Sequence, residues 1–170
     1  AFMKVGNLEG SLAERIKQCV RQGQIKEAIA LCGKTQSFIT HALEVALNAA
    51  HFPREEMESI FASYNLPVEL IRLPLVESSF NEDATSKVGA SGIWQFMESS
   101  GKMYKLKVGN SIDERNSPVK ATQAAARLLL DSHRITKSWP LAITAYNHGP
   151  GGVLKASRAV KSKNIADIVN

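Results

Sequence analysis

Hydrophobic residues recur every three or four positions through most of the 170-residue chain, which is the spacing of one face of an α-helix. Over residues 11–33 this spacing predicts two short helices that meet at Gly23, and it predicts further helices over residues 36–51 and 53–64. No segment alternates between hydrophobic and polar residues as a half-buried strand does. The chain is therefore expected to be mostly α-helical.

The central segment is predicted to interrupt this helical pattern. Residues 68–80 predict a helix that Pro74 kinks or restarts, because proline lacks the N–H of one helical hydrogen bond. Residues 81–92 are rich in Ser, Gly, Ala, Asn and Asp, a composition that is typical of loops. Residues 93–101 are expected to return to helix before a second loop.

Two longer helices are expected toward the end of the chain. Pro118 follows Ser117, and a proline at the first helical position after a serine is a typical helix start. The alanine-rich segment that follows is expected to form a buried helix. Another helix is expected to begin at Trp139 and to stop at Gly149, and a short helix and a basic tail complete the chain.

The net charge of +5 lies entirely in the second part of the chain. Residues 1–65 hold seven basic and seven acidic side chains, whereas residues 66–170 hold fourteen basic and nine acidic ones. Excess positive charge favours an anionic partner, such as nucleic acid or a cell wall with carboxylate-bearing peptides. The only cluster of basic residues lies within residues 155–163, and the others are scattered. A nucleic-acid binder usually gathers its basic residues on one face, so we expect no nucleic-acid partner.

The cysteines and histidines do not indicate a metal site. Cys19 and Cys32 have no C-x-x-C partner, and we expect two buried thiols, with a disulfide as the alternative if the turn between their helices falls elsewhere. The histidines do not pair at metal-ligand spacing; they are His41, His51, His133 and His148. We therefore expect neither a metal nor another cofactor.

Glu77 is the candidate catalytic acid. Burial among apolar neighbours would raise its pKa and make it a proton donor near neutral pH. These neighbours are Leu73, Leu75, Val76 and Phe80. The alternative is a solvated glutamate at a helix end, since most glutamates are exposed. Ser78 and Ser79 could donate hydrogen bonds to a substrate or cap the helix, and no Gly-x-Ser-x-Gly motif marks either as a nucleophile.

Three separate blocks with chemical content occur in order along the chain. They are Glu77-Ser78, residues 89–95 (Gly-Ala-Ser-Gly-Ile-Trp-Gln), and residues 145–147 (Ala-Tyr-Asn) with Gly149. Together they resemble the lytic transglycosylase domain of the soluble and membrane-bound murein transglycosylases, a branch of the lysozyme-like superfamily that includes goose-type lysozymes. The resemblance covers residues 66–158, and residues 1–65 carry no such match.

This resemblance implies a lysozyme-like helical domain with a groove for a glycan strand. Glu77 matches the family's catalytic glutamate, which protonates the oxygen between N-acetylmuramic acid and N-acetylglucosamine and then takes the proton of the muramyl C6 hydroxyl. The product would carry a 1,6-anhydro ring. That scheme needs no second carboxylate, because the internal hydroxyl replaces water and the substrate's acetamido group can stabilise the positive charge.

Six further residues are candidate substrate-binding residues: Ser78, Ser79, Gly92, Gln95, Tyr146 and Asn147. By the resemblance, Tyr146 is expected to hydrogen-bond and position Glu77, and Gln95 is expected to line the groove nearby. Gly89 and Gly92 are expected to let the backbone approach the sugar.

The chain departs from the patterns of the related families at two places. Glu82 and Asp83 stand where the family usually has a proline, and they could select a cationic or deacetylated sugar, supply a second carboxylate for hydrolysis, or form a solvated loop. Met97 stands where goose-type lysozymes carry an aspartate, which favours a transglycosylase. A lysozyme-type hydrolase and an inactive peptidoglycan-binding module are the alternatives.

The resemblance also implies an organisation and a location. The expected division is a helical extension over residues 1–65, packed on a catalytic domain over residues 66–160, with a basic tail over residues 161–170. Peptidoglycan strands as the partner imply the periplasm or cell envelope of a bacterium. The chain begins at Ala1 rather than Met, so we expect an exported monomer whose signal segment, and any membrane anchor, lie in residues absent from this chain.

Overall fold

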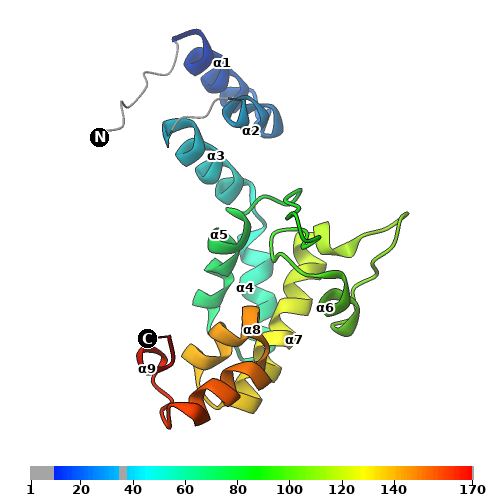
Figure 1. The fold of residues 1–170 in the computed structure, drawn as a ribbon. Helices are drawn as coiled ribbons and strands as arrows, with labels where there is room; N and C mark the ends of the chain where they lie inside the picture. Colours follow the sequence, from blue (N-terminus) through cyan, green and yellow to red (C-terminus); the bar gives the residue numbers. More distant parts are fainter. Residues whose placement is uncertain (1–9, 35–37, 170) are drawn as a thin grey trace.

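Helices make up most of the chain in the computed structural model, which describes residues 10–34 and 38–169 (Figure 1). The α-helices are α1 (Gly10–Arg21), α2 (Ile25–Gly33), α3 (Phe38–His51), α4 (Arg54–Ser63), α5 (Leu73–Ser78), α6 (Glu98–Met103), α7 (Pro118–Thr136), α8 (Trp139–Ala159) and α9 (Ile165–Val169). Two 3₁₀ helices are η1 (Val68–Arg72) and η2 (Glu114–Asn116). Within the described ranges, extended pairing is limited to isolated bridges. The expectation of a mostly α protein is confirmed, although positions 36 and 37 of the third predicted helix lie outside the described residues.

The three N-terminal helices form a small core of their own. Its buried members are Ile16, Cys19, Ala28, Leu31, Cys32 and Leu47. Both cysteines are free and buried, which confirms the expectation of two buried thiols. Figure 1 shows α1 and α2 at the end of α3 that lies away from the rest of the molecule. Contacts to the remainder of the protein include the Phe52–Phe80 ring pair and the Lys26–Glu82 ion pair.

The main core is assembled around Trp94, which is fully buried. Met57 and Phe61 of α4 join it, and the Phe61 and Trp94 rings are stacked with centroids 5.8 Å apart. The alanine-rich face of α7 closes this core: four of its buried residues are alanines, so α4 and α8 can approach α7 closely. Because α4 belongs to this core, the helical part around the site begins before the predicted division at residue 65, which itself stays a prediction.

Prolines and glycines set the helix boundaries of the second half much as predicted. Pro74 lies in the first turn of α5, directly after η1, so the chain restarts as a new helix there. Pro118 begins α7 after an extended Ser117, although the serine side chain makes no capping hydrogen bond. Gly149 adopts a left-handed φ of 69° and breaks the helical path of α8, which resumes at Pro150.

The helix expected over residues 93–101 is wrong in its first half. Ser91 and Phe96 exchange two backbone hydrogen bonds, of 3.1 and 3.2 Å, and Gln95 between them has a positive φ of 47°. These bonds close a tight turn that buries Ile93 and Trp94, so α6 begins only at Glu98. Hydrophobic spacing alone does not distinguish such a buried turn from the first turn of a helix.

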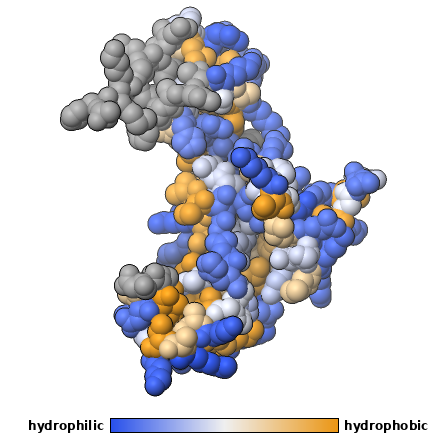
Figure 2. Space-filling view, in the orientation of Figure 1, coloured by the Kyte–Doolittle hydropathy of each residue, from blue (hydrophilic) through white to orange (hydrophobic). Residues whose placement is uncertain are grey.

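The basic tail is partly ordered by a hydrophobic contact. Residues 165–169 form α9, and Ile165 and Ile168 pack against Leu141, Ala145 and Val153 of α8. Figure 2 shows hydrophobic surface over this end of the molecule and over α5. None of the described helices is both long enough and apolar enough to cross a lipid bilayer.

Candidate active site

Glu77 lies in the last turn of α5, where the helix is ended abruptly. Ser79 and Phe80 both adopt left-handed φ angles, of 54° and 58°. Their N–H groups donate to the carbonyls of Leu75 and Pro74, each at 3.2 Å, and so satisfy the last turn of the helix. The chain therefore leaves the helix in a fixed direction immediately after Glu77.

The Glu77 side chain is half-buried, and two residues of α8, Tyr146 and Asn147, interact with it. Burial raises the pKa of Glu77 above its ordinary value, and a hydrogen bond with the Asn147 side chain opposes this in part. The negative charge of Glu77 is also felt at Tyr146, whose pKa is raised first by burial and then by that charge. Leu75 and Val76, expected to bury the glutamate, are instead 46% and 84% exposed.

The Glu77→Gln variant is expected to be more stable than the wild-type protein at neutral pH. Because the pKa of Glu77 is raised in the folded state, the folded protein binds that proton more tightly than the unfolded chain does. Stability therefore falls as the pH rises from the unfolded pKa through the folded pKa. Thermal unfolding at about pH 7 and about pH 4, on either side of the ordinary range of a glutamate, should show a gain that shrinks at the lower pH. An equal gain at both values would mean that charge burial is not its cause.

Tyr146 holds the turn that precedes α6 in place. Its hydroxyl donates to the Trp94 carbonyl at 2.6 Å, while the Trp94 indole N–H donates to the Thr122 hydroxyl at 2.9 Å. The single phenolic proton is thus used on the backbone and is not donated to Glu77. Tyr146 was expected to hydrogen-bond and position Glu77; its hydroxyl bonds to the loop backbone in the structure, and a role in positioning Glu77 stays a prediction.

The side chains of two other candidate residues, Ser78 and Gln95, are also hydrogen-bonded to backbone carbonyls of the loop. Ser78 donates to the Ile93 carbonyl at 2.9 Å, which ties the end of α5 to the turn. The Gln95 amide donates to the carbonyls of Gly92 and Ala84, at 2.8 and 3.1 Å. The predicted residues therefore converge on one region, but through bonds to backbone. Asn147, by contrast, is exposed, and Ser79 is half-buried.

Gly92 is required by a close approach of two backbone segments. It has a positive φ of 75°, and a Cβ placed on it would lie 1.8 Å from the carbonyl oxygen of Arg115. Gly92 is therefore needed for the close approach of the protein's own Arg115 backbone, and its expected role of letting the backbone approach a sugar stays a prediction. Gly89 has a φ of 86° and open space where a Cβ would be.

Arg115 of η2 connects η2 to the loop that contains Gly89 and Phe96. Its guanidinium donates to both Asp113 carboxylate oxygens, with the closest contact at 2.6 Å, and to the carbonyls of Gly89 and Phe96, at 2.8 and 3.0 Å. The pair with Asp113 is local, because the two residues are two positions apart along the chain. The two carbonyl partners were missed, because they lie 26 and 19 residues away along the chain.

Removing this guanidinium should destabilise the protein. Arg115→Met is expected to lower the free energy of unfolding by about 2–3 kcal/mol, since charge-assisted hydrogen bonds to a mostly buried side chain are lost. Arg134→Met, which removes an exposed ion pair with Asp131, should cost under about 1 kcal/mol. Chemical denaturation of the two variants measures the difference, and equal costs would contradict the bracing role of Arg115.

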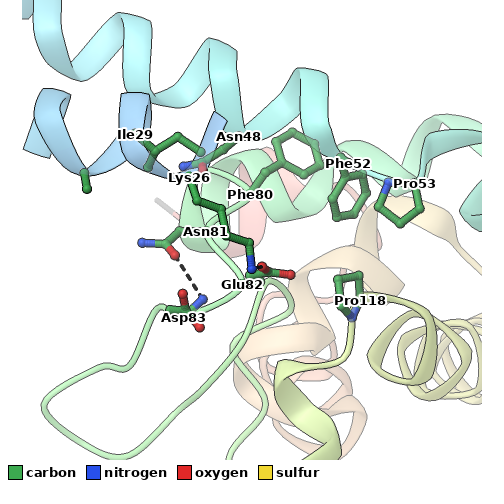
Figure 3. Close-up of a pocket in the computed structure, with 11 residues that line it drawn as sticks. Lys26, Ile29, Asn48, Phe52, Pro53, Phe80, Asn81, Glu82, Asp83 and Pro118 are labelled. Carbon is green, nitrogen blue, oxygen red and sulfur yellow. Dashed lines mark hydrogen bonds and ion pairs between the residues drawn. The ribbon is translucent and has the colours of Figure 1, made fainter. Parts of the chain in front are cut away.

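Glu82 and Asp83 turn toward the N-terminal helices (Figure 3). Glu82 forms an ion pair with Lys26 of α2 at 3.2 Å, and Asp83 is exposed with its N–H bonded to the Asn81 side chain at 2.9 Å. Both line a cavity with residues of α2 and α3. The sequence carried no motif that would have linked Lys26 to this loop. In the described ranges, no group of three or more His, Cys, Asp or Glu side chains could hold a metal ion.

Comparisons with known proteins found one matching family model and several relatives, and the family model covers the part of the chain that carries this site. A family model described as "Transglycosylase SLT domain" matches residues 58–169. The chain is 40% identical over 100 residues to the membrane-bound lytic murein transglycosylase D of Escherichia coli strain K12, a match that covers 58% of this chain and 22% of that protein. It is 39% identical over 100 residues to a protein of Alteromonas sp. strain M-1 named for tributyltin chloride resistance, covering 58% of this chain and 48% of that protein. The chain thus spans less than half the length of these relatives.

Proposed function

The chain belongs to the transglycosylase SLT domain family, and from that premise we propose that it cleaves the β-1,4 bond between N-acetylmuramic acid and N-acetylglucosamine in peptidoglycan strands. The observation that carries this proposal is the half-buried Glu77 with its raised pKa. A carboxyl group that holds its proton toward neutral pH can serve as a general acid. A relative that bears the name membrane-bound lytic murein transglycosylase D is 40% identical to this chain over 100 residues.

In the proposed mechanism, one carboxyl group acts twice. The Glu77 carboxyl gives its proton to the glycosidic oxygen, the C1–O bond breaks, and the substrate's acetamido oxygen stabilises the charge at C1. The Glu77 carboxylate then takes the proton of the C6 hydroxyl as O6 bonds to C1. The ring closes as a 1,6-anhydro sugar, no water is consumed, and the glutamic acid is restored.

The neighbouring residues are proposed to divide into two groups. Asn147 donates to Glu77 and is exposed, so it can contact both the acid and the strand. Ser79 and the backbone beside Gly92 are proposed to contact the strand as well. Ser78, Gln95 and Tyr146 position the loop through their bonds to backbone carbonyls. Glu82 and Asp83 are not proposed as a second catalytic carboxylate, because they face the cavity shared with α2 and α3.

Location and assembly follow from the substrate and are part of the same proposal. Peptidoglycan places the enzyme in the bacterial cell envelope, in the periplasm where the cell has two membranes. We propose that it acts as a monomer, because the acid and its Asn147 partner come from one chain.

Digestion of purified peptidoglycan, followed by mass spectrometry of the released fragments, tests the reaction. Fragments that end in 1,6-anhydro-muramic acid would support the transglycosylase. Reducing ends would identify a lysozyme-type hydrolase instead. Binding of the strands without release of fragments would identify a binding module.

A further inference from the structure

The cavity that Glu82 and Asp83 line has a volume of about 250 Å³ and lies between the N-terminal helices and the loop that follows α5 (Figure 3). Lys26 of α2 and Asn48 of α3 line one side, and Glu82 and Asp83 line the other. It has none of the proposed catalytic residues in its lining. The α2 and α3 side of the cavity lies outside residues 58–169, which the family model matches. This side therefore belongs to the N-terminal helices that precede the matched domain.

Asn48 offers this cavity a hydrogen-bond donor without a partner. Its side-chain Nδ2 is buried and has no hydrogen-bond partner among the described residues. An unsatisfied buried polar group costs about 1–3 kcal/mol of stability. If the Asn48 side chain turns toward the cavity that it lines, a carbonyl or carboxylate oxygen of a bound molecule can satisfy this donor.

The rim of the cavity carries charges of both signs. The Lys26 ammonium reaches Glu82 at 3.2 Å across the mouth, and its side chain is 78% exposed. An ion pair exposed to this degree contributes little to stability. Lys26 and Glu82 can therefore separate and each pair with an opposite charge on a ligand. Asp83 adds a second exposed carboxylate beside them.

The inner wall is apolar and the volume is small. The rings of Phe52 and Phe80 meet with centroids 4.7 Å apart, at an angle of 57°. Sites that enclose a whole small ligand usually measure about 300–1,000 Å³. The cavity therefore suits one residue of a polymer: a short hydrocarbon body that carries a carboxylate or carbonyl toward Lys26 and Asn48, and an amine toward Glu82 and Asp83.

We propose that this cavity binds an amino-acid residue of the peptides attached to the glycan strand, one that bears both a free amine and a free carboxylate. A neutral N-acetylated sugar would use the Asn48 donor but would leave the charges of both signs unmatched. The proposal rests on the proposed function for the identity of the strand. Because Phe80 of the cavity follows Glu77 by only three residues, we take the held peptide to belong to the strand that is cleaved. Such binding would make the enzyme selective for peptide-bearing strands.

Binding of isolated peptides tests the site without any cleavage. The probe is a synthetic stem peptide that ends in a diamino acid, titrated into the full chain and followed by calorimetry or by amide shifts. Lys26→Met and Asn48→Leu should each weaken binding by about five-fold or more, as expected for the loss of one charged or buried hydrogen bond. Lys17→Met, which breaks a similarly exposed pair with Glu14 in α1, is the matched control and should leave binding unchanged.

The Asn48→Leu variant also tests whether weaker peptide binding could result from misfolding. It removes the unpaired buried amide at nearly constant volume, so the protein should be as stable as the wild type or more stable. Acetylating the amine of the peptide, or amidating its carboxylate, should weaken binding to the wild type. No binding to the wild type, or equal binding to both cavity variants, would overturn the proposal. Weaker binding of peptide-free glycan by Asn48→Leu would overturn it in favour of a sugar site.

Cleavage assays separate this inference from the proposed function. Lys26→Met and Asn48→Leu should slow the release of fragments from peptide-bearing strands and leave the cleavage of peptide-free strands unchanged. Normal cleavage without peptide binding would overturn the inference alone. Peptide binding without cleavage of any strand would overturn the proposed function and leave the amino-acid site supported.

Discussion

Replacing Glu77 by glutamine is expected to lower the rate of glycan-strand cleavage by about 10³-fold, within the range contributed by a positioned acid–base group. Glutamine keeps the shape of the side chain and can still hydrogen-bond with Asn147, but it has no proton to give and cannot take one back. Both halves of the proposed reaction are lost with the one group. Fragment release from sacculi, measured by chromatography and mass spectrometry, gives the rate.

The matched control is Glu69→Gln, which changes an exposed glutamate on the preceding 3₁₀ helix. It should cleave at the wild-type rate. The wild-type rate should also fall as the pH rises through the raised pKa of Glu77, because only the protonated carboxyl can start the reaction. If Glu77→Gln kept most of the activity, another residue would have to act as the general acid, and the proposed mechanism would be wrong.

Local signals in the sequence predicted the helical elements well. Pro74 and Pro118 fix helix starts, and Gly149 breaks a helix, because each residue restricts or frees its own backbone. Such effects depend on near neighbours along the chain. The order of the three motif blocks predicted which loops and helices meet, through the resemblance to a family that the comparisons confirm.

Contacts between distant residues could not be derived from local patterns. The burial of Glu77 was expected from Leu75 and Val76, yet helix neighbours one and two positions away face other directions. The interactions of Glu77 with Tyr146 and Asn147 come from α8, far along the chain. Tyr146 was matched to the site, but its bond to the Trp94 carbonyl depends on how α8 packs over the turn. The pairing of Lys26 with Glu82 likewise joins segments that carry no shared motif.

Gly92→Ala is expected to lower the free energy of unfolding by roughly 4 kcal/mol, at the high end for one substitution. Its Cβ would lie 1.8 Å from the Arg115 carbonyl oxygen and 2.6 Å from the carbonyl carbon, and both belong to backbone that cannot rotate away. The left-handed φ of 75° adds strain for any residue with a side chain. Relief would require η2 to move from the loop, which would also strain the Arg115 bonds to Gly89 and Phe96.

Gly89→Ala separates the clash from the backbone strain. Gly89 has a similar left-handed φ of 86°, but open space surrounds the position of its Cβ, so only the conformational cost of about 1 kcal/mol applies. Urea denaturation of both variants isolates the contribution of the close approach as the difference between them. If the two variants lose the same stability, Gly92 serves the backbone conformation alone. If Gly92→Ala loses far more and also slows strand cleavage, the contact between Gly92 and Arg115 is what holds the loop facing Glu77 in its working position.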